Sequence, residues 1–171
     1  MVKDEVHAKF LSNFYDTHKA LGSETRAFET EVPYNYFGDR GIIDFVDHWI
    51  NRTYNLSDLS DLEPSNPGLL DFLQLYELKT ELLDIGETIR QVKKAKLFFA
   101  KGFEGNIDHL KFNPAPEHKL IVRSSLVILK TEKNISDLQK YCTSFESANI
   151  DGVFFFDLKE SKLLRRTLEV L

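Results

Sequence analysis

Two apolar stretches of the chain carry charges near their centres: "GDRGIIDF" at residues 38–45 and "LYELKTEL" at residues 75–82. Apolar runs of this length usually become buried strands, and buried strands normally exclude charge. The first run nevertheless holds Asp44, and the second holds Glu77 and Lys79. The fold and the function that we expect must therefore explain why charged residues stand within these apolar strands.

The pattern of apolar residues predicts a chain of helices and strands. The expected order is a helix over 4–21, strands over 26–37, 42–49 and 69–82, a helix over 84–102, a strand over 119–129, a helix over 135–148, a strand over 151–158 and a helical tail. Asp84 is a good N-cap for the second helix, and Glu87 stands in the capping-box position. This order is typical of an α/β fold in which helices flank a central mixed β-sheet.

The 171 residues are expected to form one domain, 1–171, because the chain can bury a core and shows no repeat and no clear linker. The core is expected over about 4–129. A polar stretch with two prolines, at about 50–68, is typical of an insertion between two strands. An extension of helix, strand and helix follows over about 130–171.

The charges of the chain are unevenly distributed. The net charge of −5 argues mildly against a general nucleic-acid coat, which would be basic all over. Residues 55–84 hold seven acids and one Lys, whereas residues 85–103 hold five bases and one Glu. This arrangement suits a site that binds a metal and then a polyanion, and it equally suits solvated helix faces.

The single cysteine, Cys142, cannot form an intramolecular disulfide, which fits a reducing compartment. The N-terminal residues alternate charged with apolar side chains and do not resemble a signal peptide. No apolar run approaches the ~20 residues of a membrane span. We therefore expect a cytoplasmic protein with no membrane partner.

The charged residues of the two apolar runs can be brought together by strand geometry. Side chains alternate faces along a strand, so Glu77 and Lys79 share one face, and Asp44 can stand beside Glu77 if the two strands pair. Two carboxylates and a backbone carbonyl form a hard-oxygen site for Mg²⁺. A metal there would polarise a phosphate oxygen and acidify bound water, while Lys79 would hold or activate that water. These are the components needed to hydrolyse a phosphodiester.

The order of turn, strand with Asp44, strand with Glu77 and Lys79, and basic helix resembles the PD-(D/E)XK nuclease superfamily. That superfamily includes many restriction endonucleases and archaeal Holliday-junction resolvases. The resemblance implies a restriction-endonuclease-like αβββαβ core over about 4–129. It also implies that Asp44 is the motif Asp, Glu77 the motif acid and Lys79 the motif Lys, and that the carbonyl of Leu78 joins the two carboxylates around the metal.

The resemblance extends to two further positions. Some branches add a Gln from the helix after the third strand, and Gln91 is the matching residue. Other branches add a Glu from the first helix, and Glu5 is the only acid near that position. We expect both residues near the site.

The resulting expectation is a Mg²⁺-dependent nuclease, with Mn²⁺ able to substitute, that acts on DNA. The residues expected to contact nucleic acid are Arg40, Arg90, Lys93, Lys94 and Lys101. A non-catalytic DNA-binding or protein-interaction domain on the same scaffold is one alternative. Another is a structural α/β protein whose Glu-x-Lys is an exposed ion pair, which requires Asp44 to lie far from Glu77. Whether the chain forms a homodimer is left open.

Overall fold

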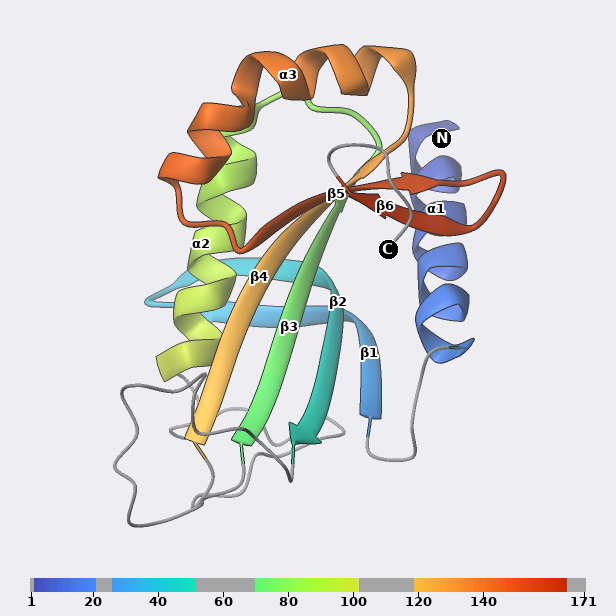
Figure 1. Ribbon diagram of the computed structural model, residues 1–171. Helices are drawn as coiled ribbons and strands as arrows, with labels where there is room; N and C mark the ends of the chain where they lie inside the picture. Colours follow the sequence, from blue (N-terminus) through green and yellow to red (C-terminus); the bar gives the residue numbers. More distant parts are fainter. Residues whose placement is uncertain (1, 21–25, 52–69, 102–118, 166–171) are drawn as a thin grey trace, which may run out of the picture.

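The computed structural model describes residues 2–20, 26–51, 70–101 and 119–165 (Figure 1). They form a six-stranded mixed sheet, ordered β1-β2-β3-β4-β5-β6, with helices on both faces. The elements are α1 (Val2–Ala20), β1 (Arg26–Tyr36), β2 (Asp39–Asn51), β3 (Leu70–Lys79), α2 (Ile85–Lys101), β4 (Lys119–Leu129), α3 (Glu132–Ser147), β5 (Gly152–Asp157) and β6 (Lys162–Arg165). The expected α/β architecture with a central mixed sheet is confirmed.

The direction of the strands follows from the connections between them. Strands β1, β2 and β3 pair antiparallel in sequence order. The chain then crosses over through α2, so that β3 and β4 pair parallel. A second crossover through α3 makes β4 and β5 parallel, and β6 returns antiparallel to β5. Asp84 caps α2 as expected, because its Oδ1 accepts the Glu87 N–H at 2.8 Å.

The α1 face of the sheet is packed by aromatic rings. Phe10 and Phe14 are fully buried and pack in one cluster with residues of β2, β3, β4 and β5. The Phe14 ring meets the rings of Phe45 and Tyr76 edge-on, each with centroids 5.2 Å apart, and that of Phe156 at 5.7 Å. This helix therefore docks through a few large side chains spaced about one turn apart.

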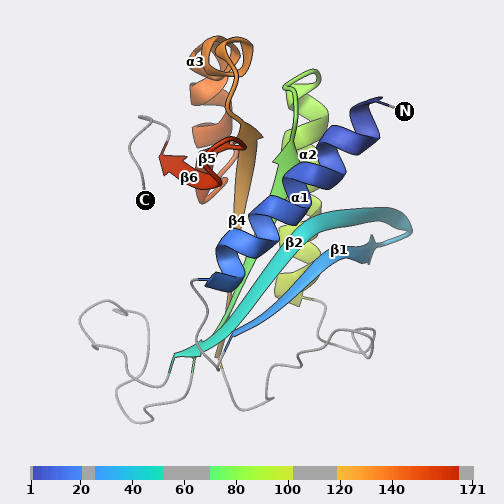
Figure 2. The same cartoon turned by 90° about the vertical axis from the view of Figure 1, so that its right-hand side faces the viewer.

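The opposite face is covered by α2 and α3 (Figures 1 and 2). Ala95 and Phe99 of α2 pack with Ile43 and Val46 of β2 and with apolar residues of β3. Leu138 and Phe145 of α3 form a second cluster with residues of β4, β5 and β6. The sheet is thus held between two apolar layers.

Strands β2 and β3 separate part of the way along their length. Their ladder ends at the Phe45–Tyr76 rung. Beyond it, residues 39–43 of β2 pair with β1, and residues 77–79 of β3 pair with β4. Figure 2 shows the β1–β2 hairpin curving away from the rest of the sheet. We call the point of separation the fork; it is formed by residues 43–45 and 76–78.

The end of the chain corrects one expectation. A helical tail is expected after 158, but residues 162–165 form strand β6, which pairs with β5. Leu163 packs with the cluster on the α1 face, while Leu164 packs with the α3 cluster. Neighbouring residues on opposite faces follow the period of two of a strand, which a helix cannot provide. Residues 166–171 lie outside the described residues.

Several other boundaries differ from expectation, two of them at the ends of β2 and β3. Strand β2 continues to Asn51, so the insertion expected over 50–68 begins later, and residues 52–69 lie outside the described residues. Strand β3 ends at Lys79 instead of 82. Just beyond it, the Thr80 carbonyl accepts a hydrogen bond at 2.8 Å from the side chain of Asn134 on α3 and not from a neighbouring strand.

The aromatic docking of α1 gives a test of the fold. We expect Phe14→Ala to lower the free energy of unfolding by about 3–5 kcal/mol, because it removes a fully buried ring and leaves a cavity among three others. Urea denaturation followed by circular dichroism measures this change. Lys9→Ala, at an exposed position of the same helix, is the control and should change stability little. Equal effects of the two substitutions would contradict the packing of α1.

Candidate functional site at the fork of the sheet

The Asp44 side chain accepts a hydrogen bond from a backbone N–H of β3 at the point where the β2–β3 ladder ends. Continuing the register by one rung would place Asp44 opposite Glu77. Instead, Asp44 Oδ2 accepts the N–H of Leu78 at 2.7 Å. The side chain thus replaces the strand–strand hydrogen bond that is lost at the fork. This bond fixes Asp44 beside β3, next to Glu77.

Glu77 is a buried carboxylate with one unsatisfied oxygen. It is 4 % exposed, and its Oε1 accepts from Lys79 Nζ at 2.6 Å. Its Oε2 is buried and has no hydrogen-bond partner among the described residues. Burial, and then repulsion by the Asp44 charge, raise the pKa of Glu77 from 4.5 to about 7, against the opposing effect of Lys79. Burial and the neighbouring Asp44 charge therefore both oppose the ionisation of Glu77.

Lys79 lies between the strand and the helix that follows it. Its Nζ donates to Glu77 Oε1 and, at 3.0 Å, to Oε1 of Gln91 on α2. The structure therefore brings together Asp44, Glu77, Lys79 and Gln91, which the sequence places on three different elements. The exposed ion pair that one alternative requires is not observed, since Glu77 is buried and feels the charge of Asp44.

A histidine that the sequence analysis did not select also reaches the site. His7 Nε2 on α1 lies 3.4 Å from Asp44 Oδ1. The hydrogen bond to Asp44 raises the pKa of His7, although partial burial opposes this. His7 precedes Phe10 by three residues and Phe14 by seven, which places it on the helix face that docks onto the sheet. This spacing is the feature of the sequence that could have identified His7 as a site residue. Glu5, the expected residue, is exposed.

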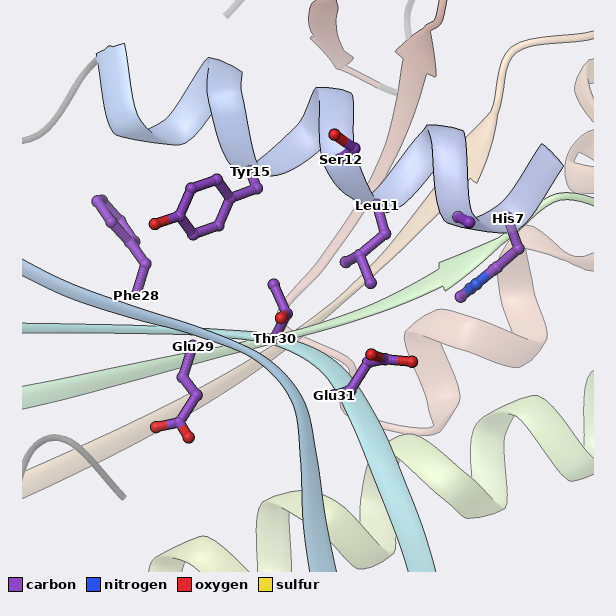
Figure 3. Close-up of a pocket in the computed structure, with 9 residues that line it drawn as sticks. His7, Leu11, Ser12, Tyr15, Phe28, Glu29, Thr30 and Glu31 are labelled. Carbon is purple, nitrogen blue, oxygen red and sulfur yellow. The ribbon is translucent and has the colours of Figure 1, made fainter. Parts of the chain in front are cut away.

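A pocket of about 760 Å³ begins at His7 and runs between α1 and β1 (Figure 3). Tyr15 and Phe28 lie at its far end, and Leu11 lies between them and His7. Glu31 extends its carboxylate towards the His7 end. His7 therefore borders both the site at the fork and an open pocket.

The backbone beside this pocket is irregular. The β1–β2 ladder has rungs at Thr30–Phe45 and Val32–Ile43 and skips the position between them. There Glu31 has a φ of 53°, which few residues with a Cβ adopt. The skipped residue, Glu31, lies across from Asp44. At Asp44, therefore, β2 pairs regularly with neither β1 nor β3.

The basic residues expected along α2 are partly engaged in ion pairs. Arg90 pairs with Glu87 on the same helix. Lys94 pairs with Asp39 at the start of β2. Lys93 and Arg40 are exposed, and the side chain of Lys101 lies outside the described residues. The structure thus places Lys94 between the helix and the β1–β2 hairpin and not on an open ridge.

The donor atoms at the fork are of the kind that a hard divalent cation prefers. Among the described residues, no group of three His, Cys, Asp or Glu side chains is placed to hold a metal. A site of two carboxylates and a backbone carbonyl does not need a third such side chain. The buried, unpaired Oε2 of Glu77 and the adjacent Asp44 fit such a cation, because it would satisfy one atom and neutralise both charges.

Comparisons with known proteins leave the site to be interpreted from its own geometry. No family model, no curated protein and no solved structure matches this chain. Among the residues that the structure describes, no helix is long and apolar enough to cross a membrane.

The raised pKa of Glu77 predicts how stability depends on pH. Because the fold favours the protonated carboxyl, its contribution is full below pH 4.5 and is lost as the pH rises through about 7. We therefore expect Glu77→Gln to become more stable relative to the wild type as the pH rises, by about 3 kcal/mol between pH 5 and 8. Urea denaturation at several pH values in EDTA measures this difference.

Two controls accompany this measurement. Glu81→Gln removes an exposed carboxylate just beyond the end of β3, and its stability difference from the wild type should change little with pH. His7, whose pKa is also raised, adds a fall in stability with rising pH that both proteins share. A difference between Glu77→Gln and the wild type that stays constant from pH 5 to 8 would show that Glu77 is ionised throughout.

Proposed function

We propose that this protein is a divalent-metal-dependent nuclease that hydrolyses phosphodiester bonds in DNA. The observation that supports this most strongly is the convergence, at the fork, of Asp44, a buried Glu77 with one unsatisfied oxygen, and Lys79. The order α1, β1, β2, β3, α2, β4 agrees with the core implied by the resemblance to PD-(D/E)XK nucleases. Membership of that superfamily is part of the proposal.

Asp44, Glu77 and the carbonyl of Leu78 would hold the metal, which we propose to be Mg²⁺ with Mn²⁺ as a substitute. His7 adjoins this place, with its Nε2 3.4 Å from Asp44 Oδ1. Bound there, the cation supplies charge stabilisation at the phosphate and lowers the pKa of a water molecule. Burial, and then repulsion by Asp44, raise the pKa of Glu77, and a cation held by both carboxylates would relieve that repulsion.

Lys79 is the residue that we assign to the reacting phosphate. Its ammonium group is held by Glu77 and Gln91, so its position is fixed before substrate binds. A third N–H remains to orient the attacking water or to stabilise charge that develops on the phosphate. Gln91 acts as a positioning residue, because its amide oxygen holds Lys79 Nζ from the helix side.

The first test is cleavage. We expect the wild type to cut DNA only with Mg²⁺ or Mn²⁺, and Lys79→Ala and Asp44→Asn each to lower the rate by at least about 100-fold. Asp44→Asn keeps an oxygen that can accept the Leu78 N–H, so the fold should be retained. The assay uses linear, nicked, branched and single-stranded DNA, with circular dichroism as the check on folding.

The matched control is Lys140→Ala, which removes an exposed lysine of α3 that pairs with Asp137. It should leave the rate unchanged. If folded Lys79→Ala and Asp44→Asn cut as fast as the wild type, the site is assigned wrongly. If the wild type cuts no substrate with either metal, the non-catalytic DNA-binding or interaction domain becomes the better interpretation.

The ion pair between Lys94 and Asp39 gives a second test, of how DNA is bound. If Lys94 neutralises a phosphate, Lys94→Gln should weaken binding of all sequences alike and reduce the slope of log affinity against log salt by about 1. Asp39→Asn should have the opposite effect, because it removes the carboxylate that competes with the phosphate.

The pair Lys140 and Asp137 on α3 is the control, since it is also an ion pair of one lysine and one aspartate. Lys140→Gln and Asp137→Asn should leave DNA affinity unchanged in fluorescence anisotropy. If the two pairs of variants behave alike, Lys94 serves only the structure and the DNA lies elsewhere.

A further inference from the structure

The pocket between α1 and β1 has the lining of a site for a flat ring. Tyr15 and Phe28 stand at one end with centroids 6.3 Å apart, edge-on, and both are only partly buried. Its volume of about 760 Å³ lies within the usual range of pockets for small ligands. Aromatic side chains in an open pocket offer their faces to a planar group, which bases share whatever their sequence.

The pocket adjoins the proposed catalytic site through His7. His7, which contacts Asp44, forms one end, and Tyr15 lies eight residues further along the same face of α1 (Figure 3). Eight residues of helix span about 12 Å. A strand whose phosphate lies at the fork can therefore reach Tyr15 with a nearby base.

The charge of the pocket selects which part of a nucleotide can enter. Glu31 extends towards its His7 end, and among the described residues that line the pocket there is no lysine or arginine. A phosphate would be repelled there, whereas the amino groups of cytosine, adenine and guanine can donate to a carboxylate. Bases stacked inside a duplex cannot enter a pocket of this kind, so the strand must be unpaired.

From the pocket's aromatic end, its acidic lining and its link to the fork through His7, we infer that it binds the bases of a single-stranded DNA segment next to the phosphate to be cut. The inference rests on the proposed function and gives it a substrate class: DNA with an unpaired strand. Tyr15 is the stacking residue, and Glu31 favours bases that carry an amino group.

The test measures binding separately from cleavage. Fluorescein-labelled 12-nucleotide strands, dC12 and dT12, are titrated with protein in Ca²⁺ and followed by anisotropy. We expect Tyr15→Leu to weaken binding about tenfold or more, and Tyr15→Phe to keep it, because stacking needs the ring and not the hydroxyl. Tyr141→Leu, at an exposed tyrosine on α3, is the matched control and should bind as the wild type does. Glu31→Gln should reduce the preference for dC12 over dT12.

Each outcome decides the inference. Equal binding by Tyr15→Leu, Tyr15→Phe and the wild type, equal binding of an abasic 12-nucleotide strand, or no preference for dC12 that Glu31→Gln changes would overturn it. If this happens while the wild type still cuts duplex DNA with Mg²⁺, the proposed nuclease stands and the pocket does not bind bases. If Tyr15-dependent binding of single strands is found without cleavage, the pocket is a base-binding site and the catalytic proposal fails.

Discussion

The hydrogen bond from the Leu78 amide to Asp44 Oδ2 is the interaction on which the site depends. A buried backbone N–H that loses its partner costs about 1–3 kcal/mol, so two strands cannot separate inside a sheet without a substitute. Asp44 supplies that substitute one rung beyond the last pairing of β2 with β3. The hairpin of β1 and β2 can then curve away, and the charges in the two apolar runs lie where the sheet opens instead of inside it.

The same opening explains why Glu77 is left with an unsatisfied oxygen. The residue sits on the β3 face that packs towards α2, and the helix supplies Gln91 to Lys79 but nothing to Oε2 of Glu77. The aromatic layer under α1 and the mixed apolar layer under α2 hold the fork from both sides. The fold can therefore tolerate a carboxylate whose pKa is raised to about 7, an arrangement that costs stability and is typical of functional sites.

Much of this could be predicted from the sequence, because the deciding patterns are local. The alternation of Glu77 and Lys79 and the apolar runs around them require only the period of two of a strand. Contacts that depend on how a helix packs against the strands could not be predicted from the sequence. That Lys94 meets Asp39 depends on where α2 lies against the hairpin, and that His7, not Glu5, reaches the site depends on how α1 rotates onto the sheet. The expected helical tail is wrong because two adjacent apolar residues, Leu163 and Leu164, fit the period of a helix as well as that of a strand.

The central claim is that Asp44 and Glu77 share a divalent cation. Titration of Mn²⁺ into the protein near pH 7, followed by electron paramagnetic resonance of the free ion, tests it most directly, because it needs no substrate. We expect the wild type to bind Mn²⁺ more tightly as the pH rises through the pKa of Glu77, about 7, since the proton and the cation compete for the carboxylate. Asp44→Asn and Glu77→Gln, both folded, should lose that binding. Equal Mn²⁺ binding by the wild type and both variants, or none by any of them at millimolar metal, would contradict the claim.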